Sequence, residues 1–287
     1  MIGRFAPSPT GVLHLGNLRT ALLAWLFARS AGSAFLVRVE DLDAGRVRPG
    51  FAERQLGDLA ALGLDWDGEV VAQSSRTELY GAALERLDVY ECFCTRAEIA
   101  EAASAAHGPV GAYPGTCRSL SAAEREARRS ERAPALRVRA DGSVVSFADR
   151  VLGEQSGFVD DFVVRRNDGA FAYNLAVVVD DGDQGVQEVV RGADLVDSTP
   201  RQIWLGRALG LPELSYAHVP LVLGPDGKRL AKRHGSVTLR EVAPAAALSW
   251  MAASLGLAGE TPRELLASFD PARVGTEPTV FDDRPRG

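Results

Sequence analysis

Lys228 and Lys232 are the only two lysines in a chain that contains thirty arginines. Both lie in one loop, residues 224–235, which is marked by proline and glycine. A lysine ammonium is a compact charge on a flexible stem, so it can follow a phosphate whose geometry changes during a reaction. The loop therefore indicates phosphoryl or nucleotidyl transfer. The alternative is chance clustering of a rare residue on a solvated turn.

The N-terminal segment could form an anion site. A short strand at Ile2–Phe5 is followed by a turn rich in proline and glycine and by a helix that begins near Asn17 and continues through the alanine-rich stretch 18–31. The free N–H groups of a helix N-terminus carry partial positive charge and bind phosphate, and His14 stands at this position. Strand–turn–helix units also occur in proteins that bind no nucleotide, so the unit by itself does not establish phosphate binding.

Three cysteines, Cys92, Cys94 and Cys117, lie within 26 residues of one another. Their odd number argues against a disulfide framework, and thiolates clustered in this way suit tetrahedral zinc. Spacing leaves the fourth ligand open between His107, Tyr113 and a nearby carboxylate, and ligand chemistry alone favours His107 because imidazole is a common zinc ligand. The alternative is that the cysteines are free buried thiols.

The elements that must position these residues alternate between strand and helix. Hydrophobic periodicity predicts a strand at 33–40 and helices at 51–62 and 76–87. A β-rich stretch follows, and the chain then returns to an α/β pattern. The β-rich stretch comprises 135–139, 143–147 and 158–165, and the later pattern comprises the apolar runs 176–180 and 188–191, read as strands, and a helix at 199–209. This order predicts a parallel nucleotide-binding sheet split by an insertion.

Taken together, the two loops resemble the signature elements of class I aminoacyl-tRNA synthetases. Residues 14–17, His-Leu-Gly-Asn, match the His-x-Gly-His element, with Asn17 in place of the second histidine. Residues 229–233, Arg-Leu-Ala-Lys-Arg, match the Lys-Met-Ser-Lys-Ser element, with Arg229 and Ala231 in place of its first lysine and first serine. Four further segments match the glutamyl branch of this class in order, at 4–11, 38–43, 190–194 and 199–202.

Within the glutamyl branch, the chain resembles the shortened glutamyl-queuosine tRNA(Asp) synthetase family more than the full-length enzymes. Only 54 of the 287 residues follow Arg233, too few for the helical anticodon-reading domain of the full-length enzymes. The shortened family uses Cys-x-Cys, Tyr and Cys as zinc ligands, and Tyr113 lies four residues before Cys117 as that pattern requires. The resemblance therefore implies a structural zinc ion held by Cys92, Cys94, Tyr113 and Cys117.

The resemblance also implies the domain organisation. We expect an α/β fold in which a Rossmann-like parallel sheet is split by a zinc-bearing α+β insertion and followed by a short, mostly helical region. The expected boundaries are 1–85 for the first half of the nucleotide-binding domain, 86–171 for the insertion, 172–205 for the second half, and 206–287 for the lysine loop and a truncated stem-contact-like region without an anticodon-binding domain.

The family pattern assigns expected roles to individual residues. The expected glutamate-binding residues are Arg4, Ala6, Ser8, Glu40, Tyr173 and Arg191, and the expected ATP-binding residues are His14, Gly16, Asn17, Lys228, Arg229, Leu230 and Lys232. His14 and Lys232 are the expected catalytic contacts to the transition state. Two alternatives compete, since Arg191 could pair with Asp194 and Tyr173 could be a core aromatic residue.

The implied activity is a ligase reaction. Glutamate is activated by ATP with Mg²⁺ and transferred to queuosine in the anticodon loop of tRNA(Asp). This chemistry depends on positioning and charge stabilisation and requires no protein nucleophile. The alternatives are a truncated conventional glutamyl-tRNA synthetase that charges a 3′ end, a small-molecule nucleotidylyltransferase, and a non-catalytic tRNA-binding paralogue.

Composition and charge limit the class of protein. No apolar run reaches the length of a membrane span and no leader precedes the first strand, so we expect a cytoplasmic monomer. From Glu260 the chain becomes charged and proline-punctuated, and we expect a loosely held tail there. The net charge of −6 requires any basic RNA-binding face to be local. The densest candidate comprises Arg118, Arg125, Arg128, Arg129, Arg132, Arg137 and Arg139, with a solvated helix face interleaved with glutamates as the alternative.

Overall fold

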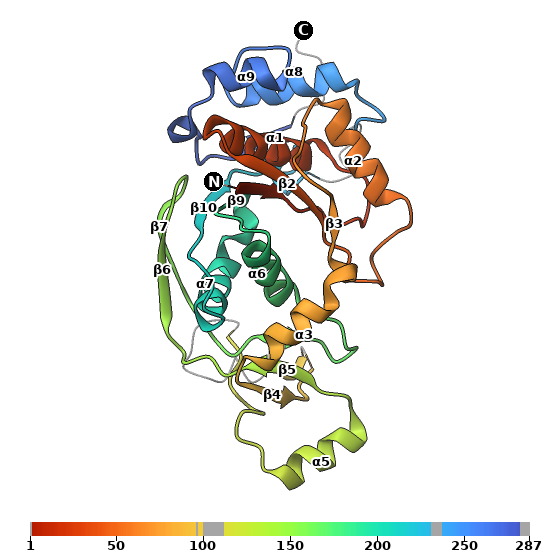
Figure 1. Ribbon diagram of the computed structural model, residues 1–287, viewed down its shortest axis with the longest axis vertical. Helices are drawn as coiled ribbons and strands as arrows, with labels where there is room; N and C mark the ends of the chain where they lie inside the picture. The colour runs from red at the N-terminus through yellow and green to blue at the C-terminus, as the bar shows by residue number, and fades with distance from the viewer. Residues whose placement is uncertain (1, 96, 100–111, 231–236, 282–287) are drawn as a thin grey trace.

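The computed structural model describes residues 2–95, 97–99, 112–230 and 237–281. Its centre is a seven-stranded sheet with strand order β3-β2-β1-β9-β10-β6-β7 (Figure 1). All neighbouring strands are parallel except β7, which pairs antiparallel with β6. The strands are β1 (Ile2–Phe5), β2 (Ala34–Val39), β3 (Val71–Ala72), β6 (Val144–Asp149), β7 (Gly153–Phe158), β9 (Glu188–Gly192) and β10 (Ser215–Val219). The predicted α/β fold with a mostly parallel sheet is confirmed.

Alternation along β1 assigns its side chains to two layers. Gly3 faces helix α1 (Leu15–Ser30), where a β-carbon at Gly3 would lie 3.1 Å from the β-carbon of Ala28. Phe5 joins the same apolar cluster, whereas Arg4 faces the opposite layer and contacts helix α6 (Tyr173–Asp183). Because successive residues of a strand point to opposite faces, one strand both anchors α1 and supplies a charged group to the other side.

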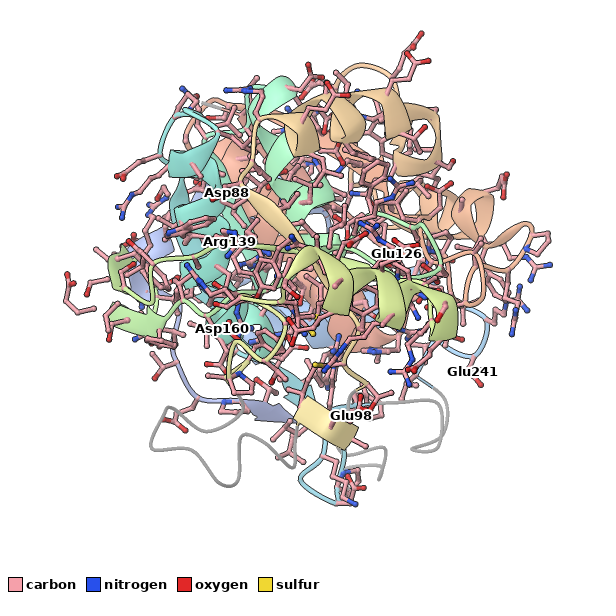
Figure 2. All side chains as sticks on the ribbon, turned by 90° about the horizontal axis from the view of Figure 1, so that it is seen from below. Asp88, Glu98, Glu126, Arg139, Asp160 and Glu241 are labelled. Carbon is pink, nitrogen blue, oxygen red and sulfur yellow. The ribbon has the colours of Figure 1, made fainter. Side chains whose placement is uncertain are left out.

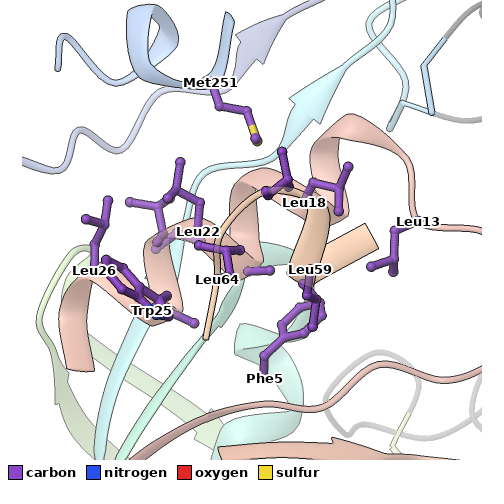
Figure 3. Packing of buried hydrophobic residues seen from close by; sticks show 14 of the residues in the cluster. Phe5, Leu13, Leu18, Leu22, Trp25, Leu26, Leu59, Leu64 and Met251 are labelled. Atoms are coloured by element: carbon purple, nitrogen blue, oxygen red, sulfur yellow. The ribbon is translucent and has the colours of Figure 1, made fainter. Parts of the chain in front are cut away.

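Helix α1 is the centre of the largest apolar cluster. It is apolar on most of its circumference, as expected for a helix that is covered on several sides. Leu18 and Leu22 lie toward Met251 and Leu64 in Figure 3, and these residues belong to one buried cluster. In Figure 1, α1, α2 (Phe51–Ala61), α8 (Pro244–Ser254) and α9 (Pro262–Ser268) lie on one side of the sheet, and α6, α7 (Thr199–Ala208) and α3 (Thr77–Glu85) lie on the other.

A second, smaller sheet forms the end of the molecule remote from α8 and α9 (Figure 1). It contains the antiparallel strands β4 (Val89–Cys92), β5 (Ala135–Val138) and β8 (Val163–Arg165), and α5 (Ala122–Glu131) lies beside it. The β6–β7 hairpin falls between β5 and β8 in the sequence but pairs with β10 of the main sheet. The part of the range 86–171 that packs separately is therefore centred on β4, α5, β5 and β8.

Two expectations about secondary structure are wrong. The run 176–180 was expected as a strand but lies in helix α6, which buries Leu175 and Val177 against the smaller sheet and turns Asp180 and Asp181 toward the main one. The predicted strand 158–165 is interrupted, because β7 ends at Phe158 and β8 begins at Val163. A short apolar run does not by itself distinguish a strand from a buried helical segment.

The segment after Glu260 is also packed and not loosely held, up to the last described residue. It forms α9, the 3-10 turn η4 (Pro271–Arg273) and β12 (Thr279–Val280), which pairs in parallel with β11 (Val222–Leu223). Phe281 is buried against Trp250, with ring centroids 5.3 Å apart. Apolar side chains spaced along the segment thus hold it to α8 and to the strand that precedes the lysine loop.

None of the helices in the described ranges combines the length and the hydrophobicity needed to cross a lipid bilayer.

Candidate functional site

The order of the strands in the main sheet reverses at β1. Strand β2 follows β1 on one side, and β9 and β10 lie on the other, so a crevice opens at the carboxyl ends of β1 and β9. Ligands of open α/β sheets bind at such switch points. A cavity of about 630 Å³ occupies this place. Its walls include ten of the residues predicted to bind glutamate or ATP, namely Arg4, Ala6, Ser8, His14, Gly16, Asn17, Glu40, Tyr173, Arg191 and Arg229.

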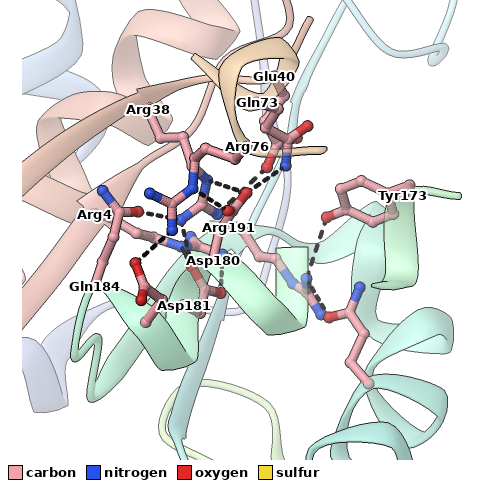
Figure 4. A network of polar contacts seen from close by, with 12 residues as sticks. Arg4, Arg38, Glu40, Gln73, Arg76, Tyr173, Asp180, Asp181, Gln184 and Arg191 are labelled. Atoms are coloured by element: carbon pink, nitrogen blue, oxygen red, sulfur yellow. Dashed lines mark hydrogen bonds and ion pairs between the residues drawn. The ribbon is translucent and has the colours of Figure 1, made fainter. Parts of the chain in front are cut away.

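Arg191, at the end of β9, is a buried cation whose hydrogen-bond partners are all uncharged side chains. Its Nη1 donates to Gln202 Oε1 at 2.7 Å and to the hydroxyl of Tyr173 at 3.4 Å (Figure 4). Its Nη2 donates to Thr199 Oγ1 at 2.7 Å, and its Nε contacts His218. Within the described ranges it forms no ion pair with a carboxylate. Its positive charge is therefore available to an anionic ligand.

Arg4 differs from Arg191 because it already has an acidic partner. Its Nε lies 3.2 Å from Asp181 Oδ1, and both side chains are buried. Asp181 also pairs with Arg38 Nη1 at 2.8 Å, and Arg38 extends the network to Asp180 (Figure 4). The network keeps Asp181 ionised, since the charges of Arg4 and Arg38 overcome the effect of burial and lower its pKa. Arg4 thus shares its charge between the network and the cavity.

Glu40 and Tyr173 lie on the cavity wall together with the turn after β1. Burial raises the pKa of Glu40, and the charges of Arg38 and Arg4 oppose this rise. A ligand ammonium beside Glu40 would favour the carboxylate further. Tyr173 is 39% exposed at the start of α6 and points its hydroxyl toward Arg191 (Figure 4), so the alternative of a core aromatic residue does not hold.

His14 caps the N-terminus of α1 beside the cavity. Its Nδ1 accepts from the backbone N–H of Asn17 at 3.3 Å, and Asn17 Oδ1 accepts from the backbone N–H of His14 at 3.4 Å. This reciprocal capping explains why an asparagine serves at position 17. Burial, assisted by the charge of Arg229, lowers the pKa of His14 to about 4. A β-carbon on Gly16 would lie 3.1 Å from the His14 ring, so a side chain there would press on the imidazole.

The described part of the lysine loop forms a turn next to this helix end. The backbone N–H of Gly224 donates to the carbonyl of Lys228 at 2.7 Å, and Lys228 is exposed. Arg229 lines the cavity and pairs with Asp194, whereas the side chain of Leu230 is buried in the main apolar cluster. A contact between Leu230 and ATP would therefore involve its backbone. Lys232 lies outside the described residues.

The sequence reasoning missed the residues that hold Arg191 in place. His218 lies on β10 and Asp149 at the end of β6, and Gln202 and Thr199 lie at the start of α7. The segment 199–202 was noted only as part of a resemblance, and nothing in the spacing of His218 or Asp149 indicated a contact with Arg191. Their proximity follows from the strand order β9-β10-β6, which residue patterns along the chain do not reveal.

The three cysteines converge beside the smaller sheet. Their sulfurs all lie within 4.8 Å of one another, and those of Cys94 and Cys117 are 3.5 Å apart. The hydroxyl of Tyr113 lies 3.4 Å from Cys92 Sγ and 3.7 Å from Cys94 Sγ. Zinc–sulfur bonds of about 2.3 Å place tetrahedral sulfurs about 3.8 Å apart, so four such donors fit one zinc ion. His107 lies outside the described residues.

Burial and charge around this cluster also suit a metal. Burial raises the pKa of Cys94 to about 11 and raises the pKa of Tyr113 above its usual range, and a bound divalent cation reverses such shifts. The guanidinium of Arg137 lies 3.8 Å from the centroid of the Tyr113 ring, and Arg128 Nη1 lies 3.8 Å from Cys117 Sγ. These two cations would offset the negative charge of the ligand set.

The arginine cluster at 118–139 is mostly occupied by partners within the protein. Arg118 pairs with Asp161, Arg129 with Glu91 and Glu126, Arg132 with Glu98, and Arg139 with Asp88. Figure 2 shows this face with acidic and basic side chains intermixed, among them Asp88, Glu98, Glu126 and Arg139. The alternative of a solvated face with interleaved charges describes it better than a continuous basic face.

Comparison with known proteins agrees with this geometry. A family model described as tRNA synthetases class I (E and Q), catalytic domain, matches residues 1–268. The Glutamyl-Q tRNA(Asp) synthetase of Nocardia farcinica is 60% identical over 98% of this chain and 93% of that protein. The protein of the same name from Symbiobacterium thermophilum is 49% identical over 97% of this chain and 95% of its own length. A glutamate tRNA ligase from Elizabethkingia meningosepticum, solved with its amino acid, superposes with a TM-score of 0.83 at 28% identity, covering 98% of this chain and 67% of that one.

Proposed function

The chain belongs to the catalytic-domain family of the class I glutamyl- and glutaminyl-tRNA synthetases, and from this membership we propose that it activates L-glutamate with ATP and transfers it to queuosine in tRNA(Asp). The observation that carries the proposal for glutamate is Arg191. Its charge is matched by no carboxylate in the described ranges, and it lines a cavity that also contains Glu40. Glutamate offers a carboxylate to Arg191 and an ammonium group to Glu40.

ATP would bind where the N-terminus of α1 meets the lysine loop. His14 uses its Nδ1 as a hydrogen-bond acceptor, which leaves Nε2–H to donate to a phosphate oxygen. Gly16, Asn17, Lys228, Arg229, Leu230 and Lys232 complete the proposed ATP contacts. Mg²⁺ would enter with ATP, held mainly by the phosphates, and would neutralise part of their charge.

The proposed reaction has two steps. An oxygen of the glutamate α-carboxylate attacks the α-phosphorus of ATP, and the bond to pyrophosphate breaks to give glutamyl-adenylate. A hydroxyl of queuosine then attacks the carbonyl carbon and releases AMP and a proton. Arg4, Ala6, Ser8, Glu40, Tyr173 and Arg191 hold the glutamate, and His14 and Lys232 stabilise charge on the reacting phosphate.

The anticodon arm would dock at the mouth of the cavity. Arg46 lines this mouth, and Arg48 and Arg54 lie on the same segment of chain. In the described part of the chain none of these three arginines forms an ion pair, in contrast to Arg118, Arg129, Arg132 and Arg139. Such cations suit RNA phosphates, and a loop nucleoside can be splayed into a neighbouring pocket. We expect the protein to act on this RNA in the cytoplasm, as a monomer.

The cysteine cluster would hold one structural zinc ion through Cys92, Cys94, Tyr113 and Cys117. A closed set of four protein ligands stabilises a fold, whereas a catalytic site leaves a position open. The cluster lies beside the smaller sheet, away from the cavity between β1 and β9. Its proposed role is to hold together the loops that follow β4 and precede α5.

The deciding experiment offers labelled glutamate and ATP with two pools of tRNA, one from cells that make queuosine and one from cells that do not. We expect label only in the first pool, and ATP–pyrophosphate exchange with glutamate but with none of the other amino acids. Equal labelling of both pools, or labelling confined to the 3′ end of tRNA(Glu), would instead indicate a truncated conventional synthetase. Absence of exchange with every amino acid, with and without tRNA, would indicate a non-catalytic paralogue.

A further inference from the structure

A buried titratable pair, His218 and Asp149, lies behind the cavity and has no part in the proposed reaction. The side chains of both residues are fully buried, and His218 Nδ1 lies 2.6 Å from Asp149 Oδ2. On the other side of the ring, His218 Nε2 lies 3.1 Å from Arg191 Nε. The three side chains thus form a line across the neighbouring strands β6, β10 and β9 to the cavity wall.

The geometry fixes the position of the imidazole proton. Arginine can donate hydrogen bonds but cannot accept them, so the contact with Arg191 Nε requires a lone pair on His218 Nε2. The proton must then reside on Nδ1, where it is donated to Asp149. The imidazole is therefore neutral. Burial lowers the pKa of His218 in agreement with this; the hydrogen bond with Asp149 opposes the effect and the charge of Arg191 adds to it.

Asp149 is itself held in place by the backbone. Its Oδ1 accepts from the N–H groups of Val151 and Leu152 at 3.0 and 2.9 Å, and both of its oxygens lie 3.1 Å from the N–H of His218. Burial alone would raise the pKa of Asp149, but the hydrogen bond with the His218 ring and these backbone hydrogen bonds together lower it. A carboxylate fixed in this manner fixes the ring orientation and the tautomer of the histidine that it contacts.

The remaining partners of Arg191 complete an uncharged shell. Gln202, Thr199 and Tyr173 accept its other hydrogen bonds, and the hydroxyl of Thr199 lies 3.0 Å from His218 Nε2. These contacts orient the guanidinium without neutralising it. An acidic side chain in any of these positions would orient it equally well but would cancel the charge that attracts a carboxylate.

We propose that His218, fixed by Asp149, is a positioning residue that orients Arg191 through an uncharged contact, and that this uncharged shell makes the pocket select glutamate over glutamine. The inference rests on the proposed function in that it assigns glutamate to this cavity. This selectivity requires Arg191 to contact the side-chain group of the ligand, since the α-carboxylate is the same in glutamate and glutamine. At that position a carboxylate gains the full charge of Arg191, whereas the neutral amide of glutamine gains only a hydrogen bond. Discrimination between these two ligands therefore depends on the shell as well as on Arg191.

The first test replaces His218 by phenylalanine, which keeps the ring but removes the acceptor, and by glutamine, which returns an uncharged acceptor. The readouts are ATP–pyrophosphate exchange, with KM measured separately for glutamate and for ATP, and thermal unfolding. We expect His218→Phe to raise the KM for glutamate about tenfold or more with little change in the KM for ATP, and His218→Gln to recover most of this loss. Tyr216→Phe is the matched control, because its ring is stacked on His218 but its hydroxyl is outside the shell.

The second test changes charge without changing shape. Gln202→Glu places a carboxylate at the position that now lies 2.7 Å from Arg191 Nη1. We expect the preference for glutamate over glutamine, measured as the ratio of kcat/KM values, to fall about tenfold or more while thermal stability stays close to that of the parent. An unchanged ratio in Gln202→Glu overturns the selectivity inference. Equal effects of His218→Phe on both KM values, or no effect on either, overturn the positioning role.

The parent protein separates failure of this inference from failure of the proposed function. If the parent does not activate glutamate, the proposed function fails, and the same variants are then compared by calorimetric binding of glutamate and glutamine. A parent that binds glutamate more tightly than glutamine, together with variants that lose this difference, still supports the inference. A parent without such a difference overturns it.

Discussion

Asp194 lies three residues after Arg191, yet its carboxylate pairs with Arg229 and not with Arg191. Asp194 Oδ2 and Arg229 Nη1 are 2.5 Å apart, which joins the end of β9 to the lysine loop across the mouth of the cavity. The sequence had left open a pair between Arg191 and Asp194. The observed pairing leaves the charge of Arg191 available to a ligand. It also gives an acidic partner to Arg229, which the proposed function assigns to ATP binding.

The first prediction follows from this pair. Because Arg229 must exchange Asp194 for a phosphate, Asp194→Asn should lower the KM for ATP by up to about fivefold. The pair is partly exposed, so the free energy of unfolding should fall by less than about 1 kcal/mol. Steady-state exchange kinetics and urea unfolding measure the two quantities. An increase in the KM for ATP would mean that Asp194 holds Arg229 in its working position.

The second prediction concerns the metal. Purified protein should contain about one zinc ion per chain, and Cys92→Ser, Cys94→Ser or Cys117→Ser should each reduce the content, because the thiolate is the strong donor. Tyr113→Phe should weaken zinc binding, and His107→Ala is the control that should retain zinc. Metal analysis of protein prepared without chelator decides the matter. Zinc lost only from the His107 variant would assign the fourth ligand to histidine.

The third prediction concerns the two lysines. Lys232→Arg should lose most of the exchange activity although the charge is kept, because a planar guanidinium cannot follow the phosphates as an ammonium does. Lys228→Arg should have a milder effect, since Lys228 is exposed on the turn and does not line the cavity. Exchange by Lys232→Arg at the parent rate would refute the argument from the rarity of lysine.

The fourth prediction is a pH dependence that arises from His14. Its pKa falls from an ordinary value of 6.5 to about 4 on folding, so the folded protein binds fewer protons than the unfolded chain between these values. The corresponding stability is fully present above pH 6.5 and is lost as the pH falls toward 4. At pH 5 the contribution of His14 to the free energy of unfolding should be about 2 kcal/mol smaller than at neutral pH.

His14→Asn provides the comparison for this effect, because asparagine caps helices but does not titrate. The free energy of unfolding, measured by urea denaturation at pH 7.5 and pH 5, should fall more in the parent than in the variant. Equal losses in the two proteins would show that other groups cause the acid sensitivity.

The fifth prediction concerns the RNA surface. Arg48→Gln and Arg54→Gln should each weaken binding of tRNA and reduce the slope of log K against log salt by about 1, as expected for the loss of one phosphate contact. Arg125→Gln on α5 removes the same charge at a distance from the cavity and should leave the slope unchanged. Exchange measured without tRNA should be the same in all three variants. A change confined to Arg125→Gln would move the RNA surface to α5.

The parts of the fold and of the site that sequence could predict are those carried by local patterns. Strand β1, the turn after it and helix α1 are contiguous, so the placement of Arg4 and His14 on the wall of one cavity follows from a single strand–turn–helix unit. The cysteine cluster was also predictable, since three thiols within a short segment have few other uses in such a chain. The placement of Arg191 in the same site as Arg4 and His14 could be predicted only from the family resemblance.

The remainder depends on tertiary structure. Helix α6 is a valine-rich run that reads as a strand, and its helical state is set by packing against two sheets. The contacts of Arg191 with His218 and of His218 with Asp149 join three strands that are distant in sequence. The packing of the segment after Glu260 depends on single apolar residues such as Phe281, whose burial no periodic pattern in the sequence predicts.

The pairing of β1 with β9 has a consequence for how the chain folds during synthesis. Gly3 pairs with Glu188, so the second neighbour of β1 leaves the ribosome only after the whole insertion has been made. Until then the sheet β3-β2-β1 presents an unpaired edge on β1, and such edges invite association with other chains. Early apolar contacts of α1 with β1 and β2 can form locally, whereas the cavity must assemble last. Slowed translation between β3 and β9, or removal of chaperones that protect exposed edges, should therefore reduce the yield of active protein. The stability of the molecules that do fold should not change.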